Sequence, residues 1–464
     1  MAIPSSLVQS LQSVKGFNQE TFEAVHASGE QVTSIRLNPA KLSSIDELEF
    51  PGDISFTKIP WSTAGYYLNT RPSFTADPLL HAGAYYVQEA SSMFLEEVLR
   101  QTVDLSVELK VLDLCAAPGG KSALIQSLLN DQSLLISNEL IKTRVNILTE
   151  NLSKWGTANV IVTNNDAASF KRLPGYFDVV VVDAPCSGSG LFRKDENAIK
   201  EWSDQNVVLC SQRQQRILED VMPSLKPGGI LIYSTCSYSE AEDEHIAAWL
   251  VNDLHMQALQ IKIADSWQIV ETVPLLNNGY GYRFFPDRLK GEGFYVAAFK
   301  KNNEVGEEER GKKHDQKRAG KLTKLSSAAL KSIARYLHNS NSYFYLLQNG
   351  ELLALPLFLE KELPYIQSAL YLKKAGISIG TLIRDELVPG HELAMSGQLA
   401  PNIIRVEVSK ENALQYLRRQ EITGQIPGTG WAIITHRSLP LGWVKLLQNR
   451  VNNYYPKEWR ILNK

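Results

Sequence analysis

A short apolar run leads into a glycine-containing turn in the segment Lys110-Val111-Leu112-Asp113-Leu114-Cys115-Ala116-Ala117-Pro118-Gly119-Gly120-Lys121-Ser122. An apolar run of this length bounded by turn residues is typical of a buried strand, so we predict a strand over 110–114. A helix is predicted to follow over 121–130. Because α/β sheets bind ligands at the carboxyl ends of their strands, and glycines let a ligand approach the backbone, the turn predicts a binding site.

Apolar runs and helical segments alternate on the C-terminal side of this turn. Alternating strands and helices imply a parallel sheet that is covered on both faces. The breaker cluster Lys226-Pro227-Gly228-Gly229 is expected to end the last long helix. The predicted strands are 133–137, 159–163, 177–183 and 230–234, the predicted helices are 141–155, 205–225 and 240–251, and 281–286 and 293–300 are predicted to close the sheet as an antiparallel pair.

Length and composition divide the 464 residues into four parts. We predict an N-terminal α+β extension over 1–100, a parallel-sheet domain over 101–300, a charged linker over 301–325 and a C-terminal α+β region over 326–464. The segment 301–324 has eight Lys or Arg, five Asp or Glu and few apolar residues, so it cannot bury a core. In the C-terminal region, Asn349-Gly350 between two apolar runs predicts a β-hairpin over 343–355.

Composition bounds the class of protein and its surroundings. The chain has no secretory signal and no apolar run near the ~18 residues of a membrane span, so we expect a cytoplasmic protein without membrane contact. Its four cysteines, at 115, 186, 210 and 236, suit a reducing compartment and contain no CxxC spacing, so no metal site is predicted. With a net charge of −2, any nucleic-acid surface must arise from local clustering. A monomer is our default expectation.

The turn nearly matches the phosphate-binding loop GxxxxGK[ST] of nucleoside triphosphatases. The acidic strand 179–183 also resembles a strand of those enzymes, so a P-loop NTPase is one alternative. However, Cys115 stands where the first glycine of the loop would fall. Pro118 also removes an N–H group from a loop that works by donating N–H groups. A ligand with an adenosine half fits the turn better.

Two acidic residues follow the next two predicted strands. Glu139 follows 133–137 and Asp166 follows 159–163. In folds that bind dinucleotides, an acid near the end of the second strand holds a ribose, which is the position of Glu139. Asp166 is placed to accept a hydrogen bond from an adenine amine. Each acid alone is more often a loop cap or a solvated carboxylate, but their order along the strands favours an adenosine site.

Two cysteines follow the last two parallel strands. Cys186 follows 177–183 and Cys236 follows 230–234. Because both strand ends face the ligand-binding edge of the sheet, we expect thiol chemistry at one shared site. The alternative is two small buried side chains, since a free cysteine is commonly buried and inert.

Together these segments resemble the NOL1/NOP2/Sun family of S-adenosylmethionine (SAM)-dependent RNA cytosine-5 methyltransferases. The resemblance spans about residues 34–300 and implies a Rossmann-like class I methyltransferase sheet. Segments 389–394 and 441–445 resemble the bacterial RsmF or YebU group, which acts on 16S ribosomal RNA and ends in a PUA-like module. The residues that carry the family resemblance are 112–121, 183–190 and 233–237, supported by 86–92, 240–244, 283–286 and 291–294.

The resemblance implies a mechanism and a set of site residues. A thiolate adds to C6 of cytosine, which makes C5 nucleophilic enough to take a methyl group. Cys236 would be the nucleophile and Cys186 would assist elimination, although analogy with DNA cytosine methyltransferases alone points to Cys186. Asp183 would hydrogen-bond N3 or N4 of the cytosine, with Lys121 near the reaction centre. The cofactor site is expected to comprise Cys115, Ala116, Ala117, Pro118, Gly119, Gly120, Lys121, Glu139, Arg144, Asp166 and Asp183.

RNA contacts are expected at two further places. Arg193 and Lys194 lie just beyond the Cys186 loop and could meet phosphates, or form a solvated pair. Residues 445–464 have five Lys or Arg, one acid and interleaved aromatics, which suit RNA, or a strand that packs its aromatics inward. Two other functions compete with methylation of ribosomal RNA, namely methylation of transfer RNA and non-catalytic binding of RNA during ribosome assembly.

Overall fold

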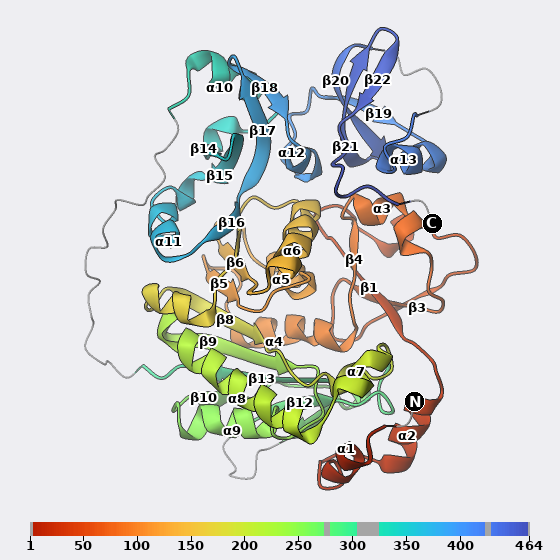
Figure 1. Ribbon diagram of the computed structural model, residues 1–464, viewed down its shortest axis with the longest axis vertical. Coiled ribbons are helices and arrows are strands. Elements are labelled where there is room, and N and C mark those ends of the chain that lie inside the picture. The colour runs from red at the N-terminus through yellow and green to blue at the C-terminus, as the bar shows by residue number, and fades with distance from the viewer. Residues whose placement is uncertain (1–2, 273–278, 304–323, 423–427, 463–464) are drawn as a thin grey trace.

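The computed structural model describes residues 3–272, 279–303, 324–422 and 428–462. Most of the predicted linker, 304–323, lies outside the described residues. A ten-stranded mixed sheet forms the centre of the molecule (Figure 1), in the order β11-β12-β13-β9-β8-β5-β6-β7-β16, with β10 paired to β13. Its strands are β5 (Lys110–Asp113), β6 (Leu134–Asn138), β7 (Val160–Thr163), β8 (Phe177–Asp183), β9 (Leu225–Thr235), β10 (Gln257–Leu259), β11 (Val270–Thr272), β12 (Gly281–Phe284), β13 (Phe294–Lys300) and β16 (Leu372–Ala375).

The direction of the strands confirms the predicted α/β sheet. β9, β8, β5, β6 and β7 run parallel. β13 pairs antiparallel with β9, and β12 pairs antiparallel with β13, as predicted for the closing pair. The carboxyl ends of the five parallel strands therefore meet at one edge, where a ligand site is expected.

Helices cover both faces of this sheet. Successive strand residues point to opposite faces, so Val111 of β5 joins the apolar cluster under α4, α5 and α6, whereas Leu112 joins the cluster under α8 and α9. The helices of this part are α4 (Leu95–Thr102), α5 (Gly120–Gln126), α6 (Lys142–Trp155), α7 (Glu196–Glu201), α8 (Asp204–Val221) and α9 (Glu244–Asn252), with 3-10 turns η4 (Ala167–Arg172), η5 (Ser189–Leu191), η6 (Met222–Ser224) and η7 (Asp265–Trp267).

The end of α6 shows why the chain needs glycine there. Gly156 follows the helix with φ +93°, a left-handed conformation that side chains rarely adopt. A Cβ on Gly156 would lie 2.4 Å from the carbonyl oxygen of Met395. Glycine therefore both ends the helix and allows the C-terminal region to approach it.

Several predicted boundaries are wrong, and the helices predicted over 205–225 and 240–251 are observed at Asp204–Val221 and Glu244–Asn252. α5 ends at Gln126 rather than near 130. The breaker cluster 226–229 does not end a helix but lies inside β9, which begins at Leu225. The Gly228 N–H donates to the Lys301 carbonyl and the Lys301 N–H donates to the Gly229 carbonyl, each over 2.9 Å. This pairing with a distant segment continues the strand through the breaker cluster, where Gly228 takes a left-handed conformation with φ +73° that glycine allows.

The N-terminal region forms a four-stranded antiparallel sheet in the order β2-β3-β1-β4. Its first two helices pack against the central domain instead, where Leu7 and Phe22 share an apolar cluster with Trp202 and Phe285. Figure 1 shows these red helices beside α7, away from their own sheet. The elements are α1 (Ser5–Ser10), α2 (Gln19–Ala27), β1 (Thr33–Leu37), η1 (Ile45–Glu47), β2 (Phe56–Lys58), β3 (Gly65–Leu68), η2 (Phe74–Ala76), α3 (Pro78–His81), β4 (Tyr85–Val87) and η3 (Ser91–Phe94).

The C-terminal region has two four-stranded sheets, ordered β14-β15-β17-β18 and β19-β20-β21-β22. The predicted hairpin is confirmed, with Asn349 and Gly350 both at positive φ between β14 and β15. The segment β16 instead extends the central sheet by pairing antiparallel with β7. The elements are α10 (Ser327–Ala334), η9 (Ser340–Ser342), β14 (Tyr343–Gln348), β15 (Glu351–Pro356), η10 (Leu357–Leu359), α11 (Leu363–Ala369), β17 (Ile377–Ile383), β18 (Glu386–Pro389), α12 (His391–Met395), β19 (Ile404–Glu407), α13 (Lys410–Leu417), β20 (Gly430–His436), β21 (Leu439–Leu447) and β22 (Arg450–Asn453).

None of the helices that the structure describes has the length and apolar character of a membrane span.

Candidate active site

A cavity of about 460 Å³ lies at the carboxyl ends of the parallel strands, a size typical of cofactor sites. The turn after β5 forms one side, the N-terminal strands β1 and β4 form a second, and the start of β13 contributes Phe294. The cavity thus combines the central and N-terminal sheets. The predicted site residues that line it are Cys115, Ala116, Ala117, Pro118, Gly120, Lys121, Arg144, Asp183 and Cys236.

The two predicted thiols lie next to each other, with Cys236 in the cavity lining and Cys186 behind it. Cys186 and Cys236 follow the neighbouring strands β8 and β9, whose last paired residues are Asp183 and Ser234. The Cys186 Sγ lies 3.2 Å from the Cys236 Sγ. The hydrogen bond to Cys236 and burial raise the pKa of the Cys186 thiol well above its usual value, so Cys186 stays protonated at neutral pH.

A buried carboxylate holds the two cysteine loops together. Glu242 lies in the turn before α9 and accepts hydrogen bonds from the Ser187 N–H (2.8 Å), the Ser187 Oγ (2.5 Å) and the Ser237 Oγ (2.7 Å). Gln214 of α8 donates to the same carboxylate over 3.2 Å. Because Ser187 and Ser237 each follow a cysteine, Glu242 fixes the separation of the two thiols.

Glycine allows the two cysteine loops to approach closely. The Gly190 N–H donates to the Cys236 carbonyl over 2.9 Å. A Cβ on Gly190 would lie 2.5 Å from the Gly293 carbonyl oxygen and 2.9 Å from that of Cys236. Any larger residue at 190 would push the Cys236 loop out of place.

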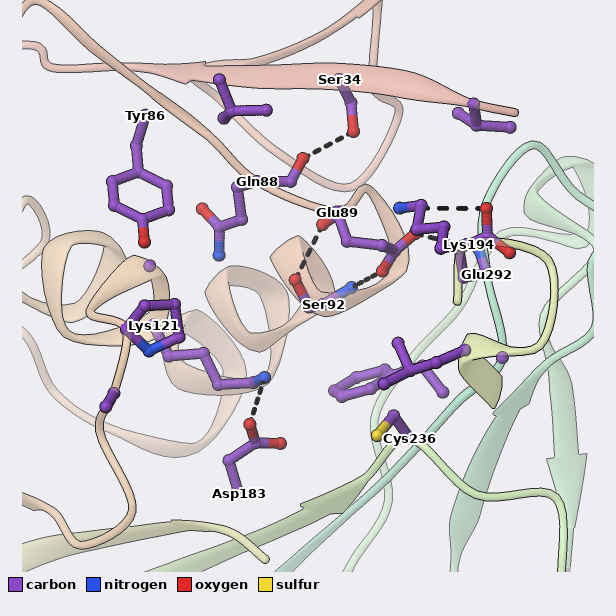
Figure 2. Close-up of a pocket in the computed structure, with 18 of the residues that line it drawn as sticks. Ser34, Tyr86, Gln88, Glu89, Ser92, Lys121, Asp183, Lys194, Cys236 and Glu292 are labelled. Carbon is purple, nitrogen blue, oxygen red and sulfur yellow. Dashed lines mark hydrogen bonds and ion pairs between the residues drawn. The ribbon is translucent and has the colours of Figure 1, made fainter. Parts of the chain in front are cut away.

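Lys121 and Asp183 form an ion pair beside the thiols. The Lys121 Nζ lies 2.8 Å from the Asp183 Oδ2, and the Ser234 Oγ donates to the Asp183 Oδ1 over 2.8 Å. Burial opposes the charge on Lys121, but Asp183 outweighs it and raises the pKa of the ammonium above its usual value. Figure 2 shows Lys121 and Asp183 pointing toward one another, with Cys236 on the same side of the cavity.

The predicted adenosine-binding residues have protein partners. The Glu139 Oε1 accepts from the Ile141 N–H (2.8 Å), and Arg144 links the Glu139 carboxylate (3.5 Å) to the Ala117 carbonyl (2.6 Å). Asp166 is exposed and accepts from the N–H and Oγ of Ser169 at the start of η4. Glu139, Asp166, Gly119 and Cys186 are not among the residues that line the cavity.

Of the two residues predicted to meet phosphates, Lys194 alone lines the cavity. The Arg193 side chain is 5% exposed and donates to the carbonyls of Glu30 and Gly291. Arg193 is thus held by the protein. The Lys194 Nζ lies 3.8 Å from the Glu292 carboxylate, and burial raises the pKa of Glu292 to about 7.

The aromatic residues of the C-terminal tail divide between interior and surface. Tyr455 is fully buried in the cluster of the last sheet, whereas Tyr454 is 41% exposed beside Trp431. Trp459 packs against His391. The inward-packing interpretation therefore applies to Tyr455 and Trp459, and Tyr454 is left available for a ligand.

Comparisons with known proteins match most of this chain. Family models match residues 101–300 (16S rRNA methyltransferase RsmB/F), 404–461 (methyltransferase RsmF PUA domain) and 3–90 (N-terminal domain of 16S rRNA methyltransferase RsmF). The ribosomal RNA small subunit methyltransferase F of Aeromonas salmonicida is 31% identical over 92% of this chain and 90% of its own length. The protein of that name from Vibrio parahaemolyticus is 29% identical over 98% and 97%.

This chain belongs to the RsmF family. Members of the family are SAM-dependent RNA methyltransferases, so the chain is an enzyme of that class, and SAM is its cofactor. The predicted family, fold class and cofactor are confirmed. The P-loop NTPase and the non-catalytic RNA-binding protein receive no support from these matches.

Two solved structures from Pyrococcus horikoshii share the fold. A methyltransferase homologue is 27% identical, with a TM-score of 0.51 over 64% of this chain and 100% of its own. NSun6, solved with the SAM analogue SFG, is 18% identical, with a TM-score of 0.53 over 65% of this chain and 98% of its own. Both therefore leave about a third of the RsmF-family chain uncovered.

The cavity also fits SAM on its own features. A Cβ on Gly120 would lie 3.1 Å from a ring carbon of Tyr86, so the turn needs glycine where it meets the N-terminal wall. Gln88 in that wall is buried with an amide that has no hydrogen-bond partner among the described residues. A preformed cavity with an unsatisfied polar group is typical of a site that awaits a ligand.

Sequence reasoning missed the residues that support the site from outside it. Glu242 belongs to the acidic run Glu240–Glu244, and the sequence gives no sign that this residue would reach both cysteine loops. In the same run Asp243 and Glu244 hold the buried Arg283. Gln88 belongs to the segment 86–92 that carries the family resemblance, which was the one signal that pointed to it.

Proposed function

We propose that this enzyme methylates C5 of cytosine in 16S ribosomal RNA through a covalent bond between Cys236 and C6. The pair of thiols 3.2 Å apart, beside the Lys121–Asp183 ion pair, carries the proposal. A methyltransferase whose target atom is already nucleophilic has no need of two cysteines. C5 of cytosine, in contrast, reacts only after a thiolate has added to C6.

The electrostatics of the pair favour Cys236 as the nucleophile. Cys186 has a raised pKa, whereas Lys121 interacts electrostatically with Cys236 and is placed to stabilise a thiolate there. Cys236 also lines the cavity, and Cys186 does not. After the methyl group has been transferred to C5, a base removes the C5 proton, the C6–S bond breaks, and Cys186, kept as a thiol, is placed to hydrogen-bond the departing sulfur.

Asp183 and Lys121 would orient the target base. Both oxygens of Asp183 have partners, the Lys121 ammonium and the Ser234 hydroxyl, which fix the orientation of the carboxylate, and a carboxylate accepts from the N4 amine of cytosine. Lys121 would donate toward the ring as negative charge develops during addition of the thiolate. When bound, SAM supplies the electrophilic methyl group. The target base must leave its stack to reach this recessed site.

Domain roles complete the proposal. We propose the boundaries 1–100, 101–300, 301–325 and 326–464, with the last region presenting the RNA to the cavity. The names of the relatives support ribosomal RNA of the small subunit as substrate. The matched PUA segment at 404–461 supports RNA contact by the second C-terminal sheet.

Methylation assays with purified components test this function. The enzyme is incubated with SAM and either 16S ribosomal RNA, small ribosomal subunits or transfer RNA, and the nucleosides are analysed by mass spectrometry. We expect 5-methylcytidine from the ribosomal substrate alone, and bisulfite sequencing then locates it. Finding 5-methylcytidine in transfer RNA would favour the alternative substrate. Methylation of another atom or base would overturn the proposal.

A further inference from the structure

Gln88 places an unsatisfied amide in the wall of the cavity. The residue follows β4 of the N-terminal sheet, lines the cavity and is 6% exposed. Among the described residues, neither its Nε2 nor its Oε1 has a hydrogen-bond partner. Burying an amide without partners is costly, so such a group is retained where a ligand completes it. The carboxylate of Glu292, which also lines the cavity, has no hydrogen-bond partner among the described residues either, but Arg193 and Lys194 lie 3.6 and 3.8 Å from it.

The backbone around Gln88 is held on both sides. The Ser34 Oγ donates to the Gln88 carbonyl over 2.6 Å. The next residue, Glu89, accepts from the N–H groups of Ser91, Ser92 and Glu292, each over 2.9 Å. A side chain on so constrained a backbone is pre-positioned, so ordering it when the ligand binds costs little conformational entropy.

The position of Gln88 identifies which end of SAM it can reach. Figure 2 shows its amide on the Tyr86 side of the cavity, above the turn, with Cys236 on the opposite side. A Cβ on Gly120 of the turn would lie 3.7 Å from the Gln88 Cδ. The transferable methyl group must face the base beside Cys236. The part of the cofactor near Gln88 is therefore remote from the reacting base.

The chemistry of an amide identifies the group. A glutamine amide donates through Nε2 and accepts through Oε1, so it suits a partner that accepts and donates side by side. The amino-acid end of SAM has a carboxylate that accepts and an ammonium that donates. Adenosine is expected toward the end of β6, beside Arg144, which lines the cavity and pairs with Glu139. This leaves the amino-acid end for the turn and for Gln88.

We propose that Gln88 binds the α-carboxylate and α-ammonium groups of SAM, so that the N-terminal region selects the intact methyl donor over nucleosides that lack an amino-acid end. The proposal rests on SAM as the cofactor but on no step of methyl transfer. It makes the N-terminal sheet a part of the cofactor site as well as a cover for it.

Calorimetry with two ligands tests the proposal without RNA. S-adenosylhomocysteine has the amino-acid end, and 5′-methylthioadenosine has the same nucleoside without it. For Gln88→Leu we expect the affinity for S-adenosylhomocysteine to fall about tenfold to hundredfold, as for loss of hydrogen bonds to charged groups. Affinity for 5′-methylthioadenosine should not change, which also shows that the variant is folded. Gln88→Glu should weaken the binding of S-adenosylhomocysteine but not of 5′-methylthioadenosine, because the new carboxylate repels the carboxylate of the ligand. The matched control is Gln132→Leu, at an exposed position.

Three results would overturn the proposal. Unchanged binding of S-adenosylhomocysteine to Gln88→Leu would show that the amide does not touch the amino-acid end. An equal loss for both ligands would make Gln88 a residue that only shapes the cavity. Unchanged binding together with a raised KM for RNA would assign the amide to the target base. Because none of the binding readouts depends on methylation, failure here is distinct from failure of the proposed function.

Discussion

Lys121 and Asp183 form an ion pair whose charged atoms lie 2.8 Å apart, although one follows β5 and the other ends β8. Their side chains are 15% and 32% exposed, so water screens the pair only in part. The pair thus keeps a fixed ammonium and a fixed carboxylate beside Cys236 before any substrate binds. Such pre-organised charge is commonly the largest contribution to catalysis.

Replacing Lys121 with methionine should slow methyl transfer about 10²- to 10³-fold, because the charge that stabilises the thiolate and the developing charge on the base is lost. The matched control is Lys171→Met, which removes an ammonium from a surface pair with Asp220. Single-turnover rates at saturating SAM and RNA provide the measurement. Equal rates for the two variants would exclude Lys121 from the chemistry.

The N-terminal wall is anchored by a buried ion pair between Arg36 of β1 and Glu96 of α4, with side chains 1% exposed. Glu96→Ala would leave the Arg36 charge buried without a partner, so we expect a loss of about 3–5 kcal/mol in unfolding free energy. The control is Glu97→Ala on the same helix, where the carboxylate accepts from Gln101. Urea unfolding measures both. Equal midpoints would show that the wall does not depend on this pair.

The same pair predicts an acid dependence. Burial opposes ionisation of Glu96, but Arg36 and Thr63 outweigh it and lower the pKa to about 2. A carboxyl whose folded pKa is lowered stabilises the fold above its unfolded pKa, near 4.5, and loses that stabilisation as pH falls toward 2. Wild-type protein should therefore lose more unfolding free energy between pH 5 and pH 3 than Glu96→Gln does. A parallel decline of the two proteins would contradict this.

The C-terminal region is attached to the central sheet through Asn165. Its Nδ2 donates to the Tyr371 carbonyl (3.0 Å) and its Oδ1 accepts from the Tyr371 N–H (2.9 Å), next to the pairing of β16 with β7. In Asn165→Ala we expect faster amide hydrogen exchange in β16, with Asn146→Ala on the exposed face of α6 as the control. Unchanged exchange would mean that β16 is held by its strand pairing alone.

Local sequence patterns predicted the elements that are determined by their own residues. β8 has the predicted bounds because both faces are buried, which gives an unbroken apolar run. The hairpin at Asn349-Gly350 follows from turn chemistry alone. β16 was missed because its partner β7 lies about 210 residues earlier in the chain. The hydrogen-bonded residues Asn165 and Tyr371 are likewise separated by 206 positions. No local sequence pattern predicts a pairing between strands so distant in the chain.

The site divides in the same way. Residues that closely follow parallel strands, such as Cys186 and Cys236, could be predicted to lie together, because parallel strands end at the same edge of the sheet. Glu242 and Gln88 could not, because their roles depend on which loops pack over them. For Arg193 the sequence left phosphate contact and a solvated pair open, because it does not reveal the carbonyls of Glu30 and Gly291 that hold the side chain.

The most direct test of the account is covalent trapping by the cysteine variants. Purified wild-type, Cys186→Ala and Cys236→Ala enzymes are incubated with SAM and 16S ribosomal RNA and resolved on a denaturing gel, with Cys210→Ala, which lies in α8, as the control. Because Cys236 would attack and Cys186 would assist release, Cys186→Ala should accumulate a protein–RNA adduct and Cys236→Ala should give neither adduct nor methylation. An adduct that forms with Cys236→Ala and not with Cys186→Ala would reverse the two roles and contradict the account.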